Sequence, residues 1–458
     1  MSGHGRTTIP PYIYEPTLTA PLPMYMLMIA VFVLGYAAIA FEHSLKIDKA
    51  AAALVTGVAC WTIYVFGGAE VHNAEHQLLE HLSEISGILF FLLGAMTIVE
   101  VVDAHEGFSV ITDRIQTKSL RVLLWTIALM TFFFSAILDN LTTSIVMISL
   151  LRKLIKDQPI RWLFAGIVII AANAGGAFSP IGDITTTMLW IGGQISAANI
   201  IAYLIVPSVF CLLAPLLYLT FTLKGEVIRP DAEPHKEGEH SISRSEQVIV
   251  LFAGVAGLLF VPVFKTVTHL PPFMGMMFSL GALWIITDTM HRSKSPSVRR
   301  QIGVLGVLRK VDTPSVLFFL GILLAVASLQ TAGHLTDLAT ALDKSIGTDS
   351  DRGIYIVGSI IGVLSSIVDN VPLVAASMGM YDIDATPYFQ QDGLFWEFLA
   401  YCAGTGGSLL IIGSASGVAV MGLERIPFGW YIKKISFLAL IGYVAGIGAY
   451  ILQHIYFV

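Results

Sequence analysis

The chain has 458 residues, of which 55% are hydrophobic and 13% are charged, and its mean hydropathy is +0.77. Soluble domains carry about 25% charged residues. The composition therefore excludes an ordinary soluble protein and predicts an all-α polytopic membrane protein. Three cysteines, Cys60, Cys211 and Cys402, lie inside apolar runs and indicate packing residues. We expect no cofactor, no enzymatic activity and no nucleic-acid partner.

Ten apolar runs are long enough to cross a bilayer, which takes about 20 residues each. In chain order they span about 24–41, 49–67, 82–103, 162–191, 196–223, 246–264, 272–290, 313–331, 395–422 and 430–456. Two further segments, about 119–152 and 352–381, each consist of two shorter apolar runs, and we call them paired runs. The first run is too long and lies too deep in the chain for a cleaved signal peptide. These runs predict a multi-pass protein embedded in membrane lipid.

The basic residues predict the orientation, because Lys and Arg resist translocation and mark cytoplasmic connections. All but four of the 26 Lys and Arg fall in one class of connection; the exceptions are Arg6, Lys265, Lys344 and Arg352. Connections rich in Lys and Arg and connections poor in them alternate along the chain only if each paired run returns to the side of the membrane from which it started. Each paired run is therefore predicted to be a re-entrant hairpin. We therefore predict a bacterial inner-membrane protein with both termini in the periplasm.

The chain also repeats itself. The segment Ser-Ala-Ile-Leu-Asp-Asn-Leu-Thr-Thr at 135–143 is matched 230 residues later by Ser-Ser-Ile-Val-Asp-Asn-Val-Pro-Leu. The pairs Gly175-Gly176 and Gly406-Gly407, like Gly182-Asp183 and Gly413-Ser414, are 231 residues apart. This order predicts two halves of five crossings and one hairpin, the second inverted. The predicted domains are a periplasmic tail (1–23), a first inverted repeat (24–223), a cytoplasmic linker (224–245) and a second inverted repeat (246–458).

The repeated Asp-Asn pairs are the first candidate site. An apolar run places Asp139 and Asp369 deep in the membrane, where a carboxylate costs several kcal/mol and usually marks an ion pathway. The alternative is helix capping, and the two roles can coexist because a hairpin tip exposes backbone groups. The hairpin that holds Asp139 is expected to open from the cytoplasm, and the one that holds Asp369 from outside.

The second candidate feature is a pair of broken helices. The segment from Asn173 to Thr187 contains several Gly and Pro180, and 404–417 is similarly rich in Gly and Ser. Such breaks free backbone carbonyls beside hydroxyls and Asp183, and these are hard oxygen ligands suited to a hard cation. Tight helix packing through small residues is the alternative. We expect no Lys or Arg inside the predicted spans to hold their carboxylates ionised, and an acid-only interior favours a cation as cargo.

Buried carboxylates also predict exchange. A carboxyl group stripped of water holds a proton firmly, and a bound cation displaces that proton. If Na⁺ and H⁺ compete for the same oxygens, the site carries one or the other, and only alternating access is then needed for antiport.

A polar cluster precedes the third apolar run. His72-Asn-Ala-Glu-His76 fits the H-x-x-E-H pattern of some zinc peptidases, although no further ligand context supports that activity. A polar periplasmic surface is the commoner explanation. Because His titrates near neutrality, a proton path or pH sensor is the remaining alternative, with these candidate residues: His72, His76, His81, Glu84 and Glu100.

At the Asp-Asn hairpins and at Ser-Pro-Ile-Gly-Asp-Ile-Thr-Thr-Thr (179–187), the sequence resembles NhaD-type Na⁺/H⁺ antiporters of the ion transporter superfamily. That superfamily includes arsenite-pump membrane subunits and sodium-coupled dicarboxylate carriers. The resemblance implies transport of Na⁺, Li⁺ and H⁺, a transport domain, and a scaffold domain that forms a homodimer. It implies a cation site made by Ser135, Asp139, Asn140, Thr142, Asn173, Asp183, Thr185, Thr186, Ser365, Asp369, Asn370, Ser408 and Ser414.

The second half departs from the first because Ser414 stands where the first half has Asp183. We therefore do not expect two equivalent sodium sites. Two other transport functions stay open on the same fold. These are a sodium-coupled organic-anion symporter, for citrate or a dicarboxylate, and a metalloid efflux permease.

Overall fold

The computed structural model describes residues 22–457 except 41, 113–114, 231–241, 293, 296–298, 300–301, 368 and 412. Most of the predicted tail and the middle of the predicted linker lie outside these residues. Within the described part, the chain folds into helices and forms no strand. Nine of these helices are long and apolar enough to cross a membrane. The protein is therefore a multi-pass membrane protein, as the composition predicts.

The helices of the first half follow the predicted apolar runs closely. They are α1 (Leu22–Ala40), α2 (Glu42–Leu45), α3 (Lys49–Phe66), α4 (Val71–Ala104), α5 (Ser109–Thr112), α6 (Leu120–Leu138), α7 (Asn140–Leu154), α8 (Gln158–Ala177), α9 (Ile184–Ile191) and α10 (Ala197–Thr222). The predicted hairpin corresponds to α6 and α7. The predicted break separates α8 from α9, where six residues without regular helix contain Pro180.

The described part of the second half is also helical. Its helices are α11 (Arg244–Thr268), α12 (Pro272–Met290), α14 (Val304–Val307), α15 (Thr313–Thr331), α16 (His334–Ser345), α17 (Asp351–Leu364), α18 (Asn370–Met380), α19 (Leu394–Gly406), α20 (Ala415–Glu424), α21 (Phe428–Tyr431), a π-helical turn (Ile432–Ser436) and α22 (Phe437–Phe457). Here α17 and α18 lie on either side of the second Asp-Asn pair, and α19 and α20 are the two parts of the broken helix.

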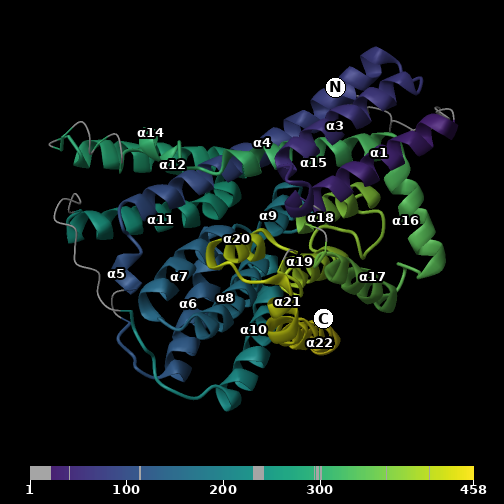
Figure 1. Ribbon diagram of the computed structural model, residues 1–458. Helices are drawn as coiled ribbons and strands as arrows, with labels where there is room; N and C mark the ends of the chain where they lie inside the picture. The colour runs from purple at the N-terminus through teal and green to yellow at the C-terminus, as the bar shows by residue number, and fades with distance from the viewer. Residues whose placement is uncertain are drawn as a thin grey trace, which may run out of the picture.

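The helices pack in two groups (Figure 1). In the first group, α3 packs on α1 and α15, and α4 packs on α12 and α15, with α11 beside α12. In the second group, α6 and α7 pack on α8, α10 packs on α22, and α17 packs on α19. We call them the peripheral group and the central group. Helices α18 and α9 of the central group contact α15 and α4 of the peripheral group, respectively.

Small residues hold each group together. A Cβ on Gly57 of α3 would lie 2.6 Å from the main-chain oxygen of Gly321 on α15, so these helix backbones touch. In the central group, Gly175 of α8 approaches the main-chain oxygen of Phe132, and Gly406 of α19 approaches that of Gly362. The last two contacts lie at equivalent positions of the two halves. Close helix approach through small residues is typical of membrane proteins.

A pair of hydrogen bonds recurs in the same way. The Ser135 hydroxyl donates to the main-chain oxygen of Ala172 at 2.5 Å, and the Ser365 hydroxyl donates to that of Ala403 at 2.8 Å. Each bond ties a hairpin to the broken helix of its own half. The matched sequence segments therefore occupy matched positions in the fold.

Candidate ion-binding site

The first hairpin turns at Asp139, between α6 and α7. The backbone of Asp139 has a φ of 99°, which is unusual for a residue with a side chain and costs about 1–3 kcal/mol. Its two carboxylate oxygens accept hydrogen bonds from the main-chain N–H and the hydroxyl of Thr142, both at 2.8 Å. Asp139 thus caps α7, and the strained turn places its carboxylate at the hairpin tip.

The broken helix of the first half brings Asp183 to the same region. Asp183 caps α9, and its side chain is 1% exposed. One oxygen, Oδ1, accepts from the main-chain N–H of Thr185 at 2.8 Å and from the Thr185 hydroxyl at 2.6 Å. The other, Oδ2, accepts from the Asn140 amide at 2.7 Å. The carboxylate is therefore fully buried among neutral donors.

Asn173 of α8 connects the two halves of the chain. Its oxygen accepts from the Asn140 amide at 3.1 Å. Its amide donates to the hydroxyls of Ser408 at 2.9 Å and Ser414 at 3.1 Å. Ser414 caps α20 as Asp183 caps α9, but without a charge. The two broken helices therefore meet at one polar network, which we call the central cluster (Asn140, Asn173, Asp183, Thr185, Ser408 and Ser414).

The remaining predicted site residues lie around this cluster in different ways. The hydroxyls of Ser135 and Ser365 donate hydrogen bonds to the broken helices, as described above. The Thr186 hydroxyl donates to the main-chain oxygen of Ala177 at 3.3 Å. Asn370 is buried as the first residue of α18, and among the described residues it makes no hydrogen bond to the central cluster. Asp183 experiences the negative charges of both Asp139 and Asp369, so the three carboxylates share one electrostatic neighbourhood.

One expectation about this region is wrong. We expected no Lys or Arg near the buried carboxylates, but the ammonium of Lys49 lies 3.8 Å from Asp369. Lys49 is the first residue of α3, and its long side chain reaches from the helix end to the second hairpin tip. Sequence distance hides this pair, because 320 residues separate its members. Asp139 and Asp183 have no such partner among the described residues.

The predicted proton-path residues do not form one group. His81 and Glu84 line a cavity of about 640 Å³ between α4, α9, α12, α15 and α18, and the His81 ring lies 3.1 Å from the Thr331 hydroxyl. His72 and His76 are exposed and do not line it. Glu100 lies about 24 Å further along α4, given the rise of a helix, and its carboxylate is 4.0 Å from Lys310. Glu100 therefore lies away from the cavity, near the C-terminal end of α4.

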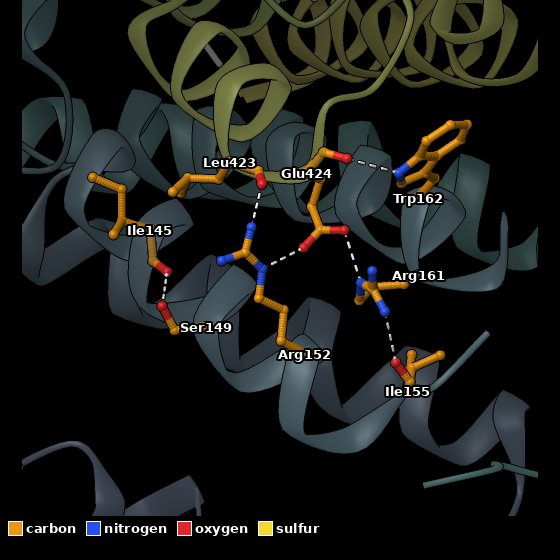
Figure 2. A network of polar contacts seen from close by, with 8 residues as sticks. All are labelled: Ile145, Ser149, Arg152, Ile155, Arg161, Trp162, Leu423 and Glu424. Atoms are coloured by element: carbon orange, nitrogen blue, oxygen red, sulfur yellow. Dashed lines mark hydrogen bonds and ion pairs between the residues drawn. The ribbon is translucent and has the colours of Figure 1, made fainter. Parts of the chain in front are cut away.

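Two buried carboxylates lie outside the predicted site. Glu424 ends α20, and its carboxylate accepts from Arg152 of α7 and Arg161 of α8, both at 2.7 Å (Figure 2). Its main-chain oxygen accepts from the Trp162 indole at 3.0 Å. Glu397 of α19 accepts instead from the Tyr450 hydroxyl at 2.6 Å and from the Asn199 amide.

Both carboxylates join a broken helix of the second half to a helix of the first half. Glu424 ties the end of α20 to the start of α8. Glu397 ties the start of α19 to the start of α10. The sequence offered one signal for the first of these networks, namely two Arg residues in a short connection near the end of an apolar run.

The chain is similar to known transporters over most of its length. A family model described as "Citrate transporter" (CitMHS) matches residues 36–396. The chain is 48% identical to "Sodium/proton antiporter 1" of Arabidopsis thaliana over 93% of this chain and 72% of that protein. It is 30% identical to "Na(+)/H(+) antiporter NhaD" of Halomonas elongata over 94% of this chain and 89% of that protein.

The fold is also known from a solved structure. The transporter YdaH of Alcanivorax borkumensis superposes with a TM-score of 0.55 at 12% identity, covering 94% of this chain and 98% of that one. The family model, which matches most of the chain, shows a transporter of the family described as "Citrate transporter". Within it, the chain belongs to the NhaD-type sodium/proton antiporter family.

Proposed function

We propose that this protein exchanges Na⁺, and also Li⁺, for H⁺, and that the two cations compete for the carboxylate of Asp183. The observation that supports this proposal most directly is that the Asp183 carboxylate is 1% exposed and contacts only neutral donors. A buried negative charge without a cationic partner is costly. A bound Na⁺ or a bound proton removes that cost, so the site favours occupation by one or the other.

The ligands of the ion would come from residues of both halves of the chain that meet in the central cluster. Na⁺ at Asp183 Oδ2 would take the place of the Asn140 amide hydrogens, and the Asn140 and Asn173 amides would turn an oxygen toward it. The hydroxyls of Thr185, Ser408 and Ser414 supply further hard oxygens. Asp139, Thr142 and Thr186 line the first-half approach in this proposal. In the proton-loaded form, the Asp183 carboxyl would donate to the Asn173 oxygen.

Alternating access would arise from two inverted repeats, 24–223 and 246–458, joined by the linker 224–245. The recurring contacts support this proposal, because Gly175 and Gly406, like Ser135 and Ser365, make the same contacts in their own halves. The central group would then move as the transport domain against the peripheral group. The cavity at His81 and Glu84 is the proposed outer access route.

We place the protein in a bacterial inner membrane with both termini in the periplasm, following the distribution of basic residues. From the family resemblance, the peripheral group would form the scaffold of a homodimer. Ser365, Asp369 and Asn370 form the proposed second-half part of the site. Ser414 leaves that half without a counterpart of the Asp183 charge, so the main ion site is assigned to the first half.

One observation favours a second candidate function, sodium-coupled transport of an organic anion. The matching family model is described as "Citrate transporter". A carboxylate substrate usually requires a guanidinium or an ammonium in its site. In the described part of the chain, the one ammonium near the carboxylates is that of Lys49, which is engaged by Asp369. The charge balance of the central cluster therefore favours a cation.

The test uses everted membrane vesicles and a pH-sensitive dye. Addition of Na⁺ or Li⁺ should move protons, whereas K⁺, citrate and arsenite should not. A response to citrate in the presence of Na⁺ would favour the organic-anion function, and a response to arsenite would favour metalloid efflux. Vesicles that carry Asp183→Asn are the matched control for leakage of protons.

A further inference from the structure

The ammonium of Lys49 occupies a position that the proposed exchange does not yet use. It lies 3.8 Å from Oδ2 of Asp369 and 4.5 Å from the ring centroid of Phe318 on α15. The side chains of Lys49 and Asp369 are 23% and 16% exposed. An ion pair that is largely withdrawn from solvent is screened much less than a surface pair.

Both members of this pair are held by rigid elements. Lys49 begins α3, which touches α15 backbone to backbone at Gly57 and Gly321. Asp369 caps α18 and accepts from the main-chain N–H of Val371 at 3.1 Å. The pair therefore connects the peripheral group, through α3 and α15, to the tip of the second hairpin in the central group. A movement that carried the second hairpin tip away from the start of α3 would break this pair.

The charges around the three carboxylates are unequal. Asp369 faces Lys49 from α3, Tyr36 from α1 and the carboxylate of Asp183 from the broken helix. Asp139 and Asp183, by contrast, contact only neutral donors among the described residues. Lys49 thus supplies one positive charge to a neighbourhood of three carboxylates, and it does so from a helix outside the central group.

We propose that Lys49 is a positioning residue that acts through Asp369. Its ammonium is a tethered cation that neutralises Asp369 and fixes the second hairpin tip to α3 and α15. A transported Na⁺ or H⁺ reaches Asp369 only when this pair opens. The proposal rests on the proposed Na⁺/H⁺ exchange, and it assigns Lys49 a role in setting ion affinity as well as in holding the hairpin.

Removal of the Lys49 charge should change the affinity for Na⁺ and H⁺ in a defined direction. Without the ammonium, the carboxylates attract Na⁺ and H⁺ more strongly, because a nearby positive charge disfavours both. Lys49→Gln should therefore lower the apparent KM for Na⁺ at alkaline pH by about 3- to 10-fold, since one pKa unit corresponds to tenfold. The half-maximal pH of exchange should rise by about half a unit to one unit, because the proton is released less readily.

The experiment compares four proteins in the vesicle assay: wild type, Lys49→Gln, Lys49→Arg and Lys46→Gln. Arg keeps the charge and should retain the wild-type KM and pH profile. Lys46 is exposed three residues away, so its substitution removes the same charge without touching Asp369 and should change neither quantity. In an Asp369→Asn background, Lys49→Gln should change the KM for Na⁺ less than it does in the wild type, because the effects of residues in contact are not additive.

The outcomes separate the two proposals. Wild-type exchange with an unchanged KM and pH profile in Lys49→Gln overturns the role of Lys49 alone. Absence of exchange in the wild type refutes the proposed function instead. If Lys49→Gln folds poorly, the double variant Lys49→Gln/Asp369→Asn should recover the folded yield, because it removes both charges. A double variant that folds no better than Lys49→Gln also overturns the proposal.

Discussion

Replacement of Glu424 by Gln tests whether the two broken helices are clamped together. The change keeps the shape of the side chain but removes the charge that Arg152 and Arg161 share (Figure 2). Hydrogen bonds to charged groups contribute about 1.5–3 kcal/mol each. Removal of one partner from a buried ion pair costs about 3–5 kcal/mol, because the other charge is left unpaired.

The exposure of each partner refines this magnitude. Glu424 is 1% exposed and Arg161 is 18% exposed, whereas Arg152 is 46% exposed and can be solvated by water. Surface partners contribute only about 0–1 kcal/mol. We therefore expect Glu424→Gln to cost about 3 kcal/mol, since Gln still accepts one hydrogen bond. Arg161→Gln should cost less than Glu424→Gln, and Arg152→Gln should cost least.

The assay is thermal unfolding of the purified protein in detergent, followed by loss of the monodisperse peak. Each kcal/mol lowers the melting temperature by about 2 °C in a chain of this size. Glu424→Gln should therefore melt about 6 °C below the wild type, and the exposed control Glu80→Gln should not change. Equal melting of Glu424→Gln and Glu80→Gln would refute the clamp, as would a larger effect of Arg152→Gln than of Arg161→Gln.

Two further predictions concern transport and topology. Asp139→Asn and Asp183→Asn should each abolish Na⁺-dependent proton movement in vesicles while the protein remains folded, because the charge that binds the cation is lost; wild-type rates in either variant would remove that residue from the mechanism. Cysteines introduced at Lys156 and Asp384, which are both exposed, should react with an impermeant label from opposite sides of the membrane. Labelling of both positions from one side would contradict the inverted repeat.

Local composition was enough to predict the elements that carry the site. Several Gly occur close together with Pro180 in one apolar run, and with Ser in another, so the breaks around Pro180 and after Gly406 could be read from the sequence. The two Asp-Asn pairs follow apolar runs and recur 230 residues apart, and both features were visible in the sequence. The breaks depend on neighbouring residues within one segment.

Contacts between distant segments could not be predicted in this way. Lys49 and Glu424 stand at the ends of apolar runs, where hydropathy assigns them to connections in water. Only the packing of α3 on α15 brings Lys49 to Asp369, and only the packing of α20 on α8 buries Glu424. The capping hydrogen bonds of Asp139 and Asp183 likewise show that cap and candidate ligand are the same residues.

The most direct test of competition at Asp183 is the half-maximal Na⁺ concentration for exchange, measured between about pH 6.5 and about pH 9.5 in vesicles without an imposed gradient. If Na⁺ and H⁺ share one carboxylate, the proton must leave before Na⁺ binds. The half-maximal concentration should then fall by up to about tenfold per pH unit and level off at alkaline pH. A half-maximal concentration that does not change with pH would contradict a shared site.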